Sequence, residues 1–418
     1  MIDRRTMLVA ATLVGMQTAP GAAQTLVPPS ADPADRLQAI ARQTRQRLEF
    51  DGRQFAGPAY HWLHDQATAA QFFRLGEEHG IAENPKLAAQ LFRDLAPAGY
   101  AHVGVEIAPQ MATAIDRALL LGGLDGLRDF FRDDRTRVAF FGMREEAEWI
   151  AAARSDPEPV LWGIDYDVAA DGYLISLLET RRKPAAAQAA LARLKIASAA
   201  MWAAYDRSRD PKFLFAFNGD PELVRAVRGA WPNPDPESGW LLETLEESLA
   251  INQLWTARQA YASNQRRVAF MRRNLLRHLA SSRRNGRLPK AMFKCGSNHM
   301  MRGLTSVRTF DMGTLLPEIA ALEGGTSFGL LVLPGVDSRI GQVDITTFRF
   351  RPTPAKDNYA AGLEALTGAA WPDAFTLFDT HPLRPLSGSD RLPRALVDAI
   401  HGYDAILVMS GSTPSSNL

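Results

Sequence analysis

The sequence has a single cysteine, Cys295, among its 418 residues, so no disulfide forms within the chain. After the N-terminal segment it also has no hydrophobic run of the roughly 18–20 residues that a membrane-spanning helix needs. Positive and negative charges nearly balance, with 47 Lys and Arg against 46 Asp and Glu, and a His-Glu-x-x-His zinc motif is missing. These absences favour a small-molecule substrate over nucleic acid or an anionic membrane, and they predict no membrane anchor in the mature chain.

The first 23 residues have the three parts of a secretory signal peptide. The basic start contains Arg4 and Arg5, the short apolar core is Met7–Met16, and the small residues Gly21–Ala23 follow. We expect cleavage near Gln24 and a periplasmic or secreted product, in which 45 basic residues balance 45 acidic ones. The adjacent arginines also fit a twin-arginine signal, so the sequence leaves the export route open.

The rest of the chain alternates short apolar runs, bounded by Gly, Pro or Asp, with helical stretches. This pattern predicts an α/β fold with a mostly parallel central sheet flanked by helices. The first helix is expected from Asp35 to about Leu48. A segment without strand signal, about residues 173–285, predicts a large helical insertion into one domain that covers residues 24–418. The expected strands are Phe72–Leu75, His102–Ile107, Val160–Ile164, Ala291–Cys295, Phe328–Leu333, Phe375–Phe378 and Ala405–Met409.

Titratable side chains stand where several of these strands end. Glu77 and His79 follow the first apolar run, Glu106 and Asp165 close the next two, and His299 follows the run that contains Cys295. Parallel strands open onto one crevice at their carboxyl ends, so we expect these groups to converge. A buried carboxylate without a partner costs several kcal/mol or shifts its pKa, so Glu106 should lie beside a histidine or another cation.

More ordinary interpretations remain open for some of these residues. The segment Gly76–Gly80 also fits a strand-to-helix turn with solvated acids, and Asp165 also fits a helix cap. Cys295 lies within an apolar strand, so we expect its thiol to be structural and inert.

The order of these motifs resembles the erythromycin esterase family. Its members typically show Gly-Glu-x-x-His-Gly, a strand that ends in Glu, Gly-Phe-Asp, an Arg-Asp-x-x-Met-x-x-Asn helix, His-Asn-x-His and a terminal Phe-Asp-Ala strand. The resemblance spans nearly the whole mature chain. The matching segments are, in chain order, Gly76–Gly80, Val105–Glu106, Gly163–Asp165, Arg267–Asn274, Ser297–His299 and Tyr403–Ile406.

The resemblance implies hydrolysis of a cyclic ester by a water molecule that His79 deprotonates. In this scheme Glu77 and Glu106 orient the histidine or the water, and His299 faces them across the cleft. Lys86 stands seven residues after His79, where these enzymes often carry an arginine, and is expected to bind substrate. Either Lys86 or a backbone amide would stabilise the oxyanion.

The same resemblance points to three further residues, Asp165, Arg267 and Asn274, which match the Gly-Phe-Asp segment and the Arg-Asp-x-x-Met-x-x-Asn helix. All three are expected to bind substrate, and a structural role stays open for Arg267 and Asn274.

The sequence leaves a second function and a second chemistry open. Glu77 and His79 are separated by one residue, and this Gly-Glu-x-His spacing resembles the haem-binding ChaN-like lipoproteins. That resemblance implies a periplasmic haem- or ligand-binding protein without catalytic activity. No cofactor is required by the hydrolase, but its nitrogen and oxygen donors are also enough for one divalent metal ion. Substrate identity and oligomeric state are not determined by the sequence.

Overall fold

The computed structural model describes residues 32–132, 138, 141–154, 160–344, 346–355 and 362–418. The expected signal peptide, residues 1–23, lies outside the described residues. Within the described part of the chain, no helix has the length and apolar character needed to cross a membrane.

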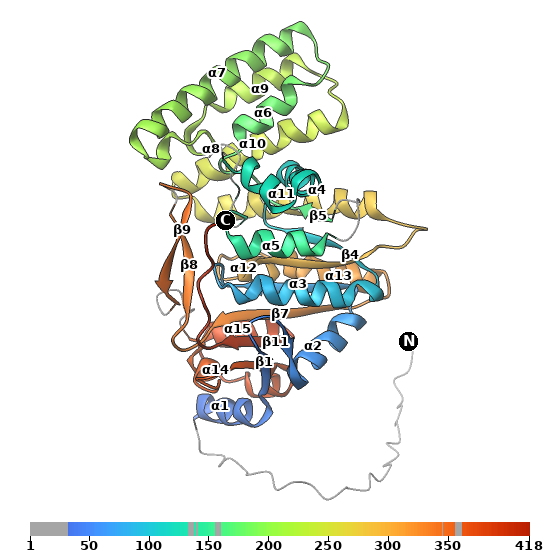
Figure 1. Cartoon of the computed structure of the whole chain (residues 1–418), viewed down its shortest axis with the longest axis vertical. Coiled ribbons are helices and arrows are strands. Elements are labelled where there is room, and N and C mark those ends of the chain that lie inside the picture. The colour runs from blue at the N-terminus through green and yellow to red at the C-terminus, as the bar shows by residue number, and fades with distance from the viewer. Residues whose placement is uncertain (1–31, 133–137, 139–140, 155–159, 345, 356–361) are drawn as a thin grey trace, which may run out of the picture.

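A nine-stranded sheet runs through the lower body of the described chain (Figure 1). Its strand order is β2-β1-β10-β11-β7-β3-β6-β4-β5, and the six strands from β11 to β5 are parallel. The predicted α/β fold with a mostly parallel sheet is therefore confirmed. The strands are β1 (Gln46–Phe50), β2 (Phe55–Ala56), β3 (Phe72–Glu77), β4 (Tyr100–Val105), β5 (Leu161–Gly163), β6 (Lys290–Gly296), β7 (Ser327–Pro334), β8 (Arg339–Asp344), β9 (Arg349–Pro354), β10 (Phe375–Asp379) and β11 (Ala405–Met409).

Helices cover both faces of the sheet, which explains why its central strands read as continuous apolar runs. All six residues of β3 are buried. Successive side chains alternate between faces, so Phe73 and Leu75 join one core while Phe72 joins the other. The α-helices are α1 (Pro33–Thr44), α2 (Gly57–Ala69), α3 (Glu83–Leu95), α4 (Pro109–Phe130), α5 (Arg144–Ala153), α6 (Asp171–Glu179), α7 (Ala185–Ser208), α8 (Phe215–Asn218), α9 (Pro221–Ala230), α10 (Pro236–Thr256), α11 (Ala260–Ser282), α12 (Ser297–Met300), α13 (Met312–Leu322), α14 (Glu364–Thr367) and α15 (Arg394–Gly402).

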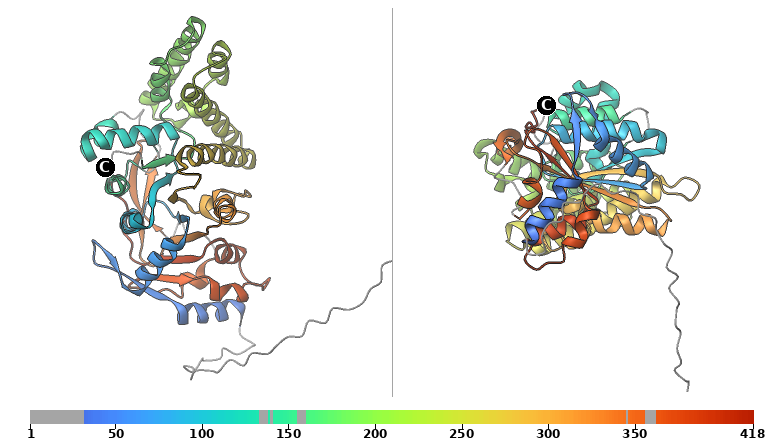
Figure 2. Two further views of the ribbon diagram at one scale, coloured as in Figure 1. Left: turned by 90° about the vertical axis from the view of Figure 1, so that its right-hand side faces the viewer. Right: turned by 90° about the horizontal axis from the view of Figure 1, so that it is seen from below.

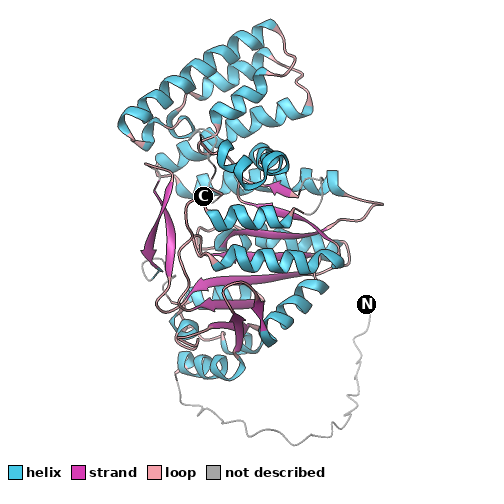
Figure 3. Cartoon of the chain, viewed as in Figure 1, coloured by secondary structure: helices cyan, strands magenta, loops and turns pink. Residues whose placement is uncertain are grey.

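The chain between β5 and β6 consists of helices α6–α11 and contains no strand among its described residues (Figure 3). These helices extend beyond the β5 edge of the sheet, and the view in Figure 2 shows α6–α10 standing away from the sheet-containing body. They have their own apolar core, which includes Leu174, Leu191, Val224 and Leu245. Helix α11 returns to the sheet, where Met271 and Leu275 join the core beneath α13.

The prediction for the first helix was wrong at its C-terminal end. Helix α1 ends at Thr44, and Gln46–Phe50 form strand β1. Leu48 is buried because β1 pairs antiparallel with β10, a contact with residues more than 300 positions away. The hairpin β8–β9 was also missed, since it forms a separate two-stranded sheet with many exposed side chains.

A close contact at Gly76 connects the sheet to helix α12. A Cβ atom at Gly76 would lie 2.2 Å from the hydroxyl oxygen of Tyr403. That hydroxyl donates a hydrogen bond of 2.5 Å to the carbonyl oxygen of Ser297, the first residue of α12. The missing side chain at Gly76 therefore lets Tyr403 hold α12 at the end of β6.

We expect Gly76→Ala to lower the free energy of unfolding by about 1–3 kcal/mol, because the new methyl group overlaps the ring of Tyr403. Urea denaturation measures this change. Tyr403→Leu should lower the free energy of unfolding by less in the Gly76→Ala background than in the wild type. The control is Gly229→Ala in α9, where a Cβ atom meets nothing within 4 Å. Equal stability of the two alanine variants would contradict the steric explanation.

Candidate active site

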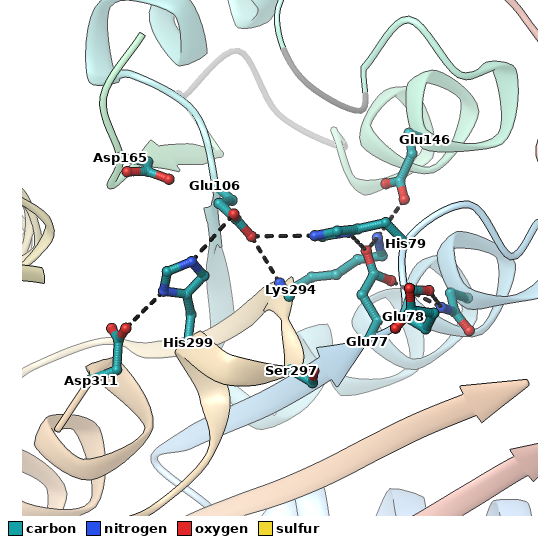
Figure 4. Close-up of polar contacts among 12 residues, drawn as sticks. Glu77, Glu78, His79, Glu106, Glu146, Asp165, Lys294, Ser297, His299 and Asp311 are labelled. Atoms are coloured by element: carbon teal, nitrogen blue, oxygen red, sulfur yellow. Dashed lines mark hydrogen bonds and ion pairs between the residues drawn. The ribbon is translucent and has the colours of Figure 1, made fainter. Parts of the chain in front are cut away.

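Functional side chains gather where four neighbouring strands of the sheet end (Figure 4). Glu77 is the last residue of β3, Glu106 follows β4 directly, and Asp165 lies two residues after β5. His299 lies in α12, which begins immediately after β6. Because these strands are parallel and adjacent, their carboxyl ends bring together residues that are up to 222 positions apart in the sequence.

The carboxylate of Glu106 connects the cluster. Its Oε2 atom accepts a 2.8 Å hydrogen bond from the backbone N–H of Gly296 and lies 3.5 Å from Nε2 of His79. Its Oε1 atom lies 2.6 Å from Nη2 of Arg267 and 3.4 Å from Nε2 of His299. Burial opposes ionisation of Glu106, but the charges of His299 and Arg267 outweigh it and hold the pKa of the carboxyl well below its usual value.

Each histidine holds a second carboxylate through its other ring nitrogen. Nδ1 of His79 lies 2.9 Å from Oε1 of Glu77, and Nδ1 of His299 lies 2.9 Å from Oδ2 of Asp311. Burial alone would lower both pKa values. The hydrogen bonds and charges of the flanking carboxylates, Glu106 foremost, outweigh burial and raise the pKa of each histidine to about 10.

A pKa of about 10 favours the protonated form of both imidazoles at neutral pH. The reason is the second carboxylate: every ring nitrogen of His79 and His299 faces an acid, so removing either proton leaves a lone pair directed at negative charge.

The sequence interpretation missed a buried lysine that completes the cluster. Nζ of Lys294 lies 2.8 Å from Oε1 of Glu77 and 2.5 Å from Oε1 of Glu146 in α5. All three side chains are at most 4% exposed. Burial opposes ionisation of Glu77, but the charge of Lys294 outweighs it and lowers the pKa of that carboxyl. The sequence did carry one signal for Lys294, because a lysine within the apolar run of β6 indicates a buried charge that needs a partner.

Two other residues of the cluster gave little sequence signal. Glu146 lies on a helix whose other charges are exposed or half-buried, and only packing against the sheet buries it. Asp311 caps helix α13 by accepting a hydrogen bond from the N–H of Met312, a local role that conceals its contact with His299.

Arg267 and Asp165 lie together at the β5 side of the cluster. The guanidinium of Arg267 binds both oxygens of Asp165 as well as Glu106. Donor atoms of Glu106, Asp165 and His299 all lie within 4.8 Å of one another, an arrangement that suits a divalent ion. The guanidinium, however, already places a cation against both carboxylates, so these residues do not fit a metal unless Arg267 moves away.

Asn274 has the structural role that the helix motif left open beside substrate binding. Its side chain is fully buried and donates toward the carbonyl oxygens of Ile164 and Asp165, while its own oxygen accepts from Nε1 of Trp240. It therefore fixes the segment that carries Asp165.

Lys86 also lies elsewhere than expected. Its Nζ atom lies 5.7 Å from the centroid of the Phe50 ring, on the outer part of the sheet near β1. No contact in the described part of the chain joins Lys86 to His79 or Glu106. The lysine that the fold brings to the cluster is Lys294, because β6 lies directly between β3 and β4.

Gly296 permits the close approach of His79 and Glu106. A Cβ atom at this position would lie 2.9 Å from Nε2 of His79 and 3.3 Å from Oε2 of Glu106. Any larger residue would displace one of the two groups, so the glycine matches the geometry of the cluster.

Two side chains that serve as nucleophiles in other enzymes, a serine and a cysteine, do not take part in the cluster. Gly325–Gly329 matches a Gly-x-Ser-x-Gly pattern, but Ser327 begins β7 at the opposite end of the strands and accepts a hydrogen bond from Nε of Arg74. Cys295 is 1% exposed, and burial raises the pKa of its thiol well above the usual value. Neither position supplies an activated nucleophile.

Comparisons with known proteins give matches at the level of structure only. No protein-family model matches the chain, and no curated protein matches it. An erythromycin esterase mutant, EreC in its open conformation, aligns with a TM-score of 0.60 and 14% identity over 90% of this chain and 99% of that one. The chain has the fold of an erythromycin esterase.

Two further solved structures agree with this assignment. A protein from Bacillus cereus aligns with a TM-score of 0.56 and 11% identity over 92% of this chain and 99% of that one. A succinoglycan biosynthesis protein aligns with a TM-score of 0.57 and 11% identity over 92% and 98%. The resemblance drawn from the sequence motifs is thus confirmed for the fold, which these similarities cover almost from end to end.

We expect Lys294→Met to lower the free energy of unfolding by about 3–5 kcal/mol, because it leaves Glu77 and Glu146 buried without their shared cation. Chemical denaturation measures the loss. Lys290→Met, on the same strand, is the control, since Nζ of Lys290 donates to the carbonyl oxygen of Thr68 at 2.5 Å and lies 5.7 Å from the centroid of the Tyr100 ring, with no carboxylate paired to it in the described part of the chain. A Lys294→Met variant as stable as the control would show that the two carboxyls are neutral.

Nuclear magnetic resonance of imidazole-labelled protein should show His79 and His299 protonated at pH 7, with titration near pH 10. Glu106→Gln should lower both pKa values, because it removes the carboxylate that the two rings share. Titration of His79 below pH 7 in the wild type would contradict this account of the cluster.

Proposed function

We propose that the protein is a hydrolase that cleaves an ester or lactone with water, using His79 to move protons. The observation that carries the proposal is the pair of histidines bridged by Glu106 at the carboxyl ends of parallel strands. This is the place where open α/β sheets bind ligands, and the fold is that of a known esterase. The signal peptide expected at residues 1–23 supports action outside the cytoplasm.

His79 is the group through which the cluster exchanges protons with a substrate. Its side chain is 28% exposed, whereas those of Glu77, Glu106 and Lys294 are 8% exposed or less. In the reactive form the imidazole of His79 is neutral. Nδ1 keeps its proton and donates it to Glu77, and Nε2 carries no proton. Nε2 takes a proton from water as the water oxygen bonds to the carbonyl carbon, and it returns that proton to the alcohol oxygen as the ester C–O bond breaks.

Two cations lie beside Glu106 to stabilise the negative charge that develops on the carbonyl oxygen. His299 is protonated and Arg267 is permanently charged, and both are 11–22% exposed. Removing a donor of this kind typically lowers kcat by about 10²–10³-fold. This assignment replaces the expected oxyanion role of Lys86.

The engaged histidines argue against the haem-binding alternative. An axial ligand needs a neutral ring nitrogen directed at iron, but the ring nitrogens of His79 and His299 face carboxylates. Adding the purified protein to haem should therefore leave the Soret band of free haem unshifted. A shifted, sharpened band that His79→Ala removes would favour ligand binding over hydrolysis.

We expect His79→Gln to lower kcat/KM by about 10²–10⁴-fold on any ester or lactone that the wild type cleaves. A pH-stat assay of neutral esters and lactones, erythromycin among them, measures acid release, and a chelator should leave the rate unchanged. His381→Gln is a matched control because its Nδ1 also binds an acid two residues before it, 2.7 Å away, on the surface. Full activity in His79→Gln would exclude the mechanism.

The pH profile should rise toward alkaline pH. Because His79 must lose a proton from a pKa of about 10 before it accepts one from water, kcat/KM should increase almost tenfold per pH unit between about pH 7 and 9. It should reach a maximum near pH 10, where His299 also loses the proton that stabilises the oxyanion. Rates are corrected for hydroxide-catalysed hydrolysis. A profile that is flat from pH 6 to 9 would show that the protonated ring, not the neutral one, is the active form.

A further inference from the structure

A cavity of about 150 Å³ lies beside Glu106, outside the charged cluster. Its walls are mostly apolar, although Asp167 and Tyr166 join Glu106 in lining it. Burial raises the pKa of Asp167 to about 7, so this carboxyl is only partly charged at neutral pH. The apolar walls named here come from three segments. These are Ile107 and Ala108 after β4, Val168 and Ala169 after β5, and Val343, Phe348 and Phe350 of the hairpin.

The hairpin wall is held in place by the helical insertion (Figure 1). The hydroxyl of Tyr205 in α7 donates a 3.0 Å hydrogen bond to the carbonyl oxygen of Thr346, and its ring lies 5.9 Å from that of Phe348. Phe348 has φ +52°, a left-handed conformation that bulky residues rarely adopt. Such a conformation persists only where surrounding contacts impose it, so the wall is built into the fold.

The same hairpin contacts the loop that carries His79. The backbone N–H of Gly341 in β8 donates a 2.8 Å hydrogen bond to the carbonyl oxygen of Gly80, the residue after His79. One element thus borders both the cavity and the proton-transferring residue. Glu106 lines the cavity and also contacts His79, so the cavity lies next to the position of the reacting ester.

We propose that this cavity is a specificity subsite that takes an apolar group about the size of a benzene ring, on the acyl or the alcohol side of the ester. That the bound group belongs to an ester rests on the proposed function. That the cavity binds an apolar ring does not. Its size supports the class of ligand, because an apolar cavity of about 150 Å³ binds benzene. A macrocyclic ring system does not fit in this volume.

Hydrolysis of matched esters tests the proposal. The rates for ethyl benzoate and benzyl acetate are compared with that for ethyl acetate, each divided by its hydroxide-catalysed rate. The wild type should prefer at least one aromatic ester by at least tenfold in kcat/KM. Val343→Trp fills the cavity and should bring this ratio close to one. Phe348→Gly enlarges it and should extend the preference to ethyl 2-naphthoate.

Val336→Trp is the matched control, since Val336 and Val343 are similarly exposed, at 48% and 45%, but Val336 does not line the cavity. Circular dichroism and thermal melting verify that the variants fold. An aromatic preference that survives in Val343→Trp, or no preference in the wild type, would overturn the subsite.

Binding of toluene, which has no bond to hydrolyse, separates this proposal from the proposed function. Saturation-transfer NMR should detect toluene on the wild type and on Val336→Trp but not on Val343→Trp. Binding with this pattern and no turnover of any ester would refute the hydrolase while leaving the apolar subsite. Ester turnover without toluene binding would refute the subsite alone.

Discussion

The buried carboxylate of Glu106 is the constraint on which the candidate site depends. A carboxylate taken out of water must be compensated, and here His79, His299, Arg267 and one backbone N–H do so from separate elements. Each of those cations then needs further anions, which Glu77, Asp311 and Asp165 supply. The alternation of charge spreads outward from this single group.

The fold stabilises these alternating charges because each charged side chain comes from a rigid element. Parallel strands place Glu77, Lys294 and Glu106 side by side, while helix α11 of the insertion brings Arg267 back to the sheet. The hairpin β8–β9 contacts both the His79 loop and helix α7 of the insertion. Thus the insertion and the hairpin, which lie far from each other in the sequence, together border the place where a substrate would react.

Much of the site was predictable because its residues obey a local rule. Apolar runs that stop at Glu77, Glu106, Asp165 and the segment before His299 indicate strand ends, and in a parallel sheet strand ends meet. Lys294, Glu146 and Asp311 were missed for the opposite reason. Their local patterns describe a strand interior, a helix face and a helix cap, and only packing turns those positions toward the cluster.

The sequence by itself determined the α/β class, which parallel strands end in titratable residues, and the absence of strands from the insertion. It could do so because hydrophobic periodicity is a property of local segments. Only the tertiary structure decided which lysine joins the site, that Asn274 supports the Asp165 loop, and that an apolar cavity lies beside Glu106. It also decided that the pKa values of His79 and His299 are raised. A pKa depends on the charges within a few ångströms, and those charges come from segments that the sequence keeps far apart.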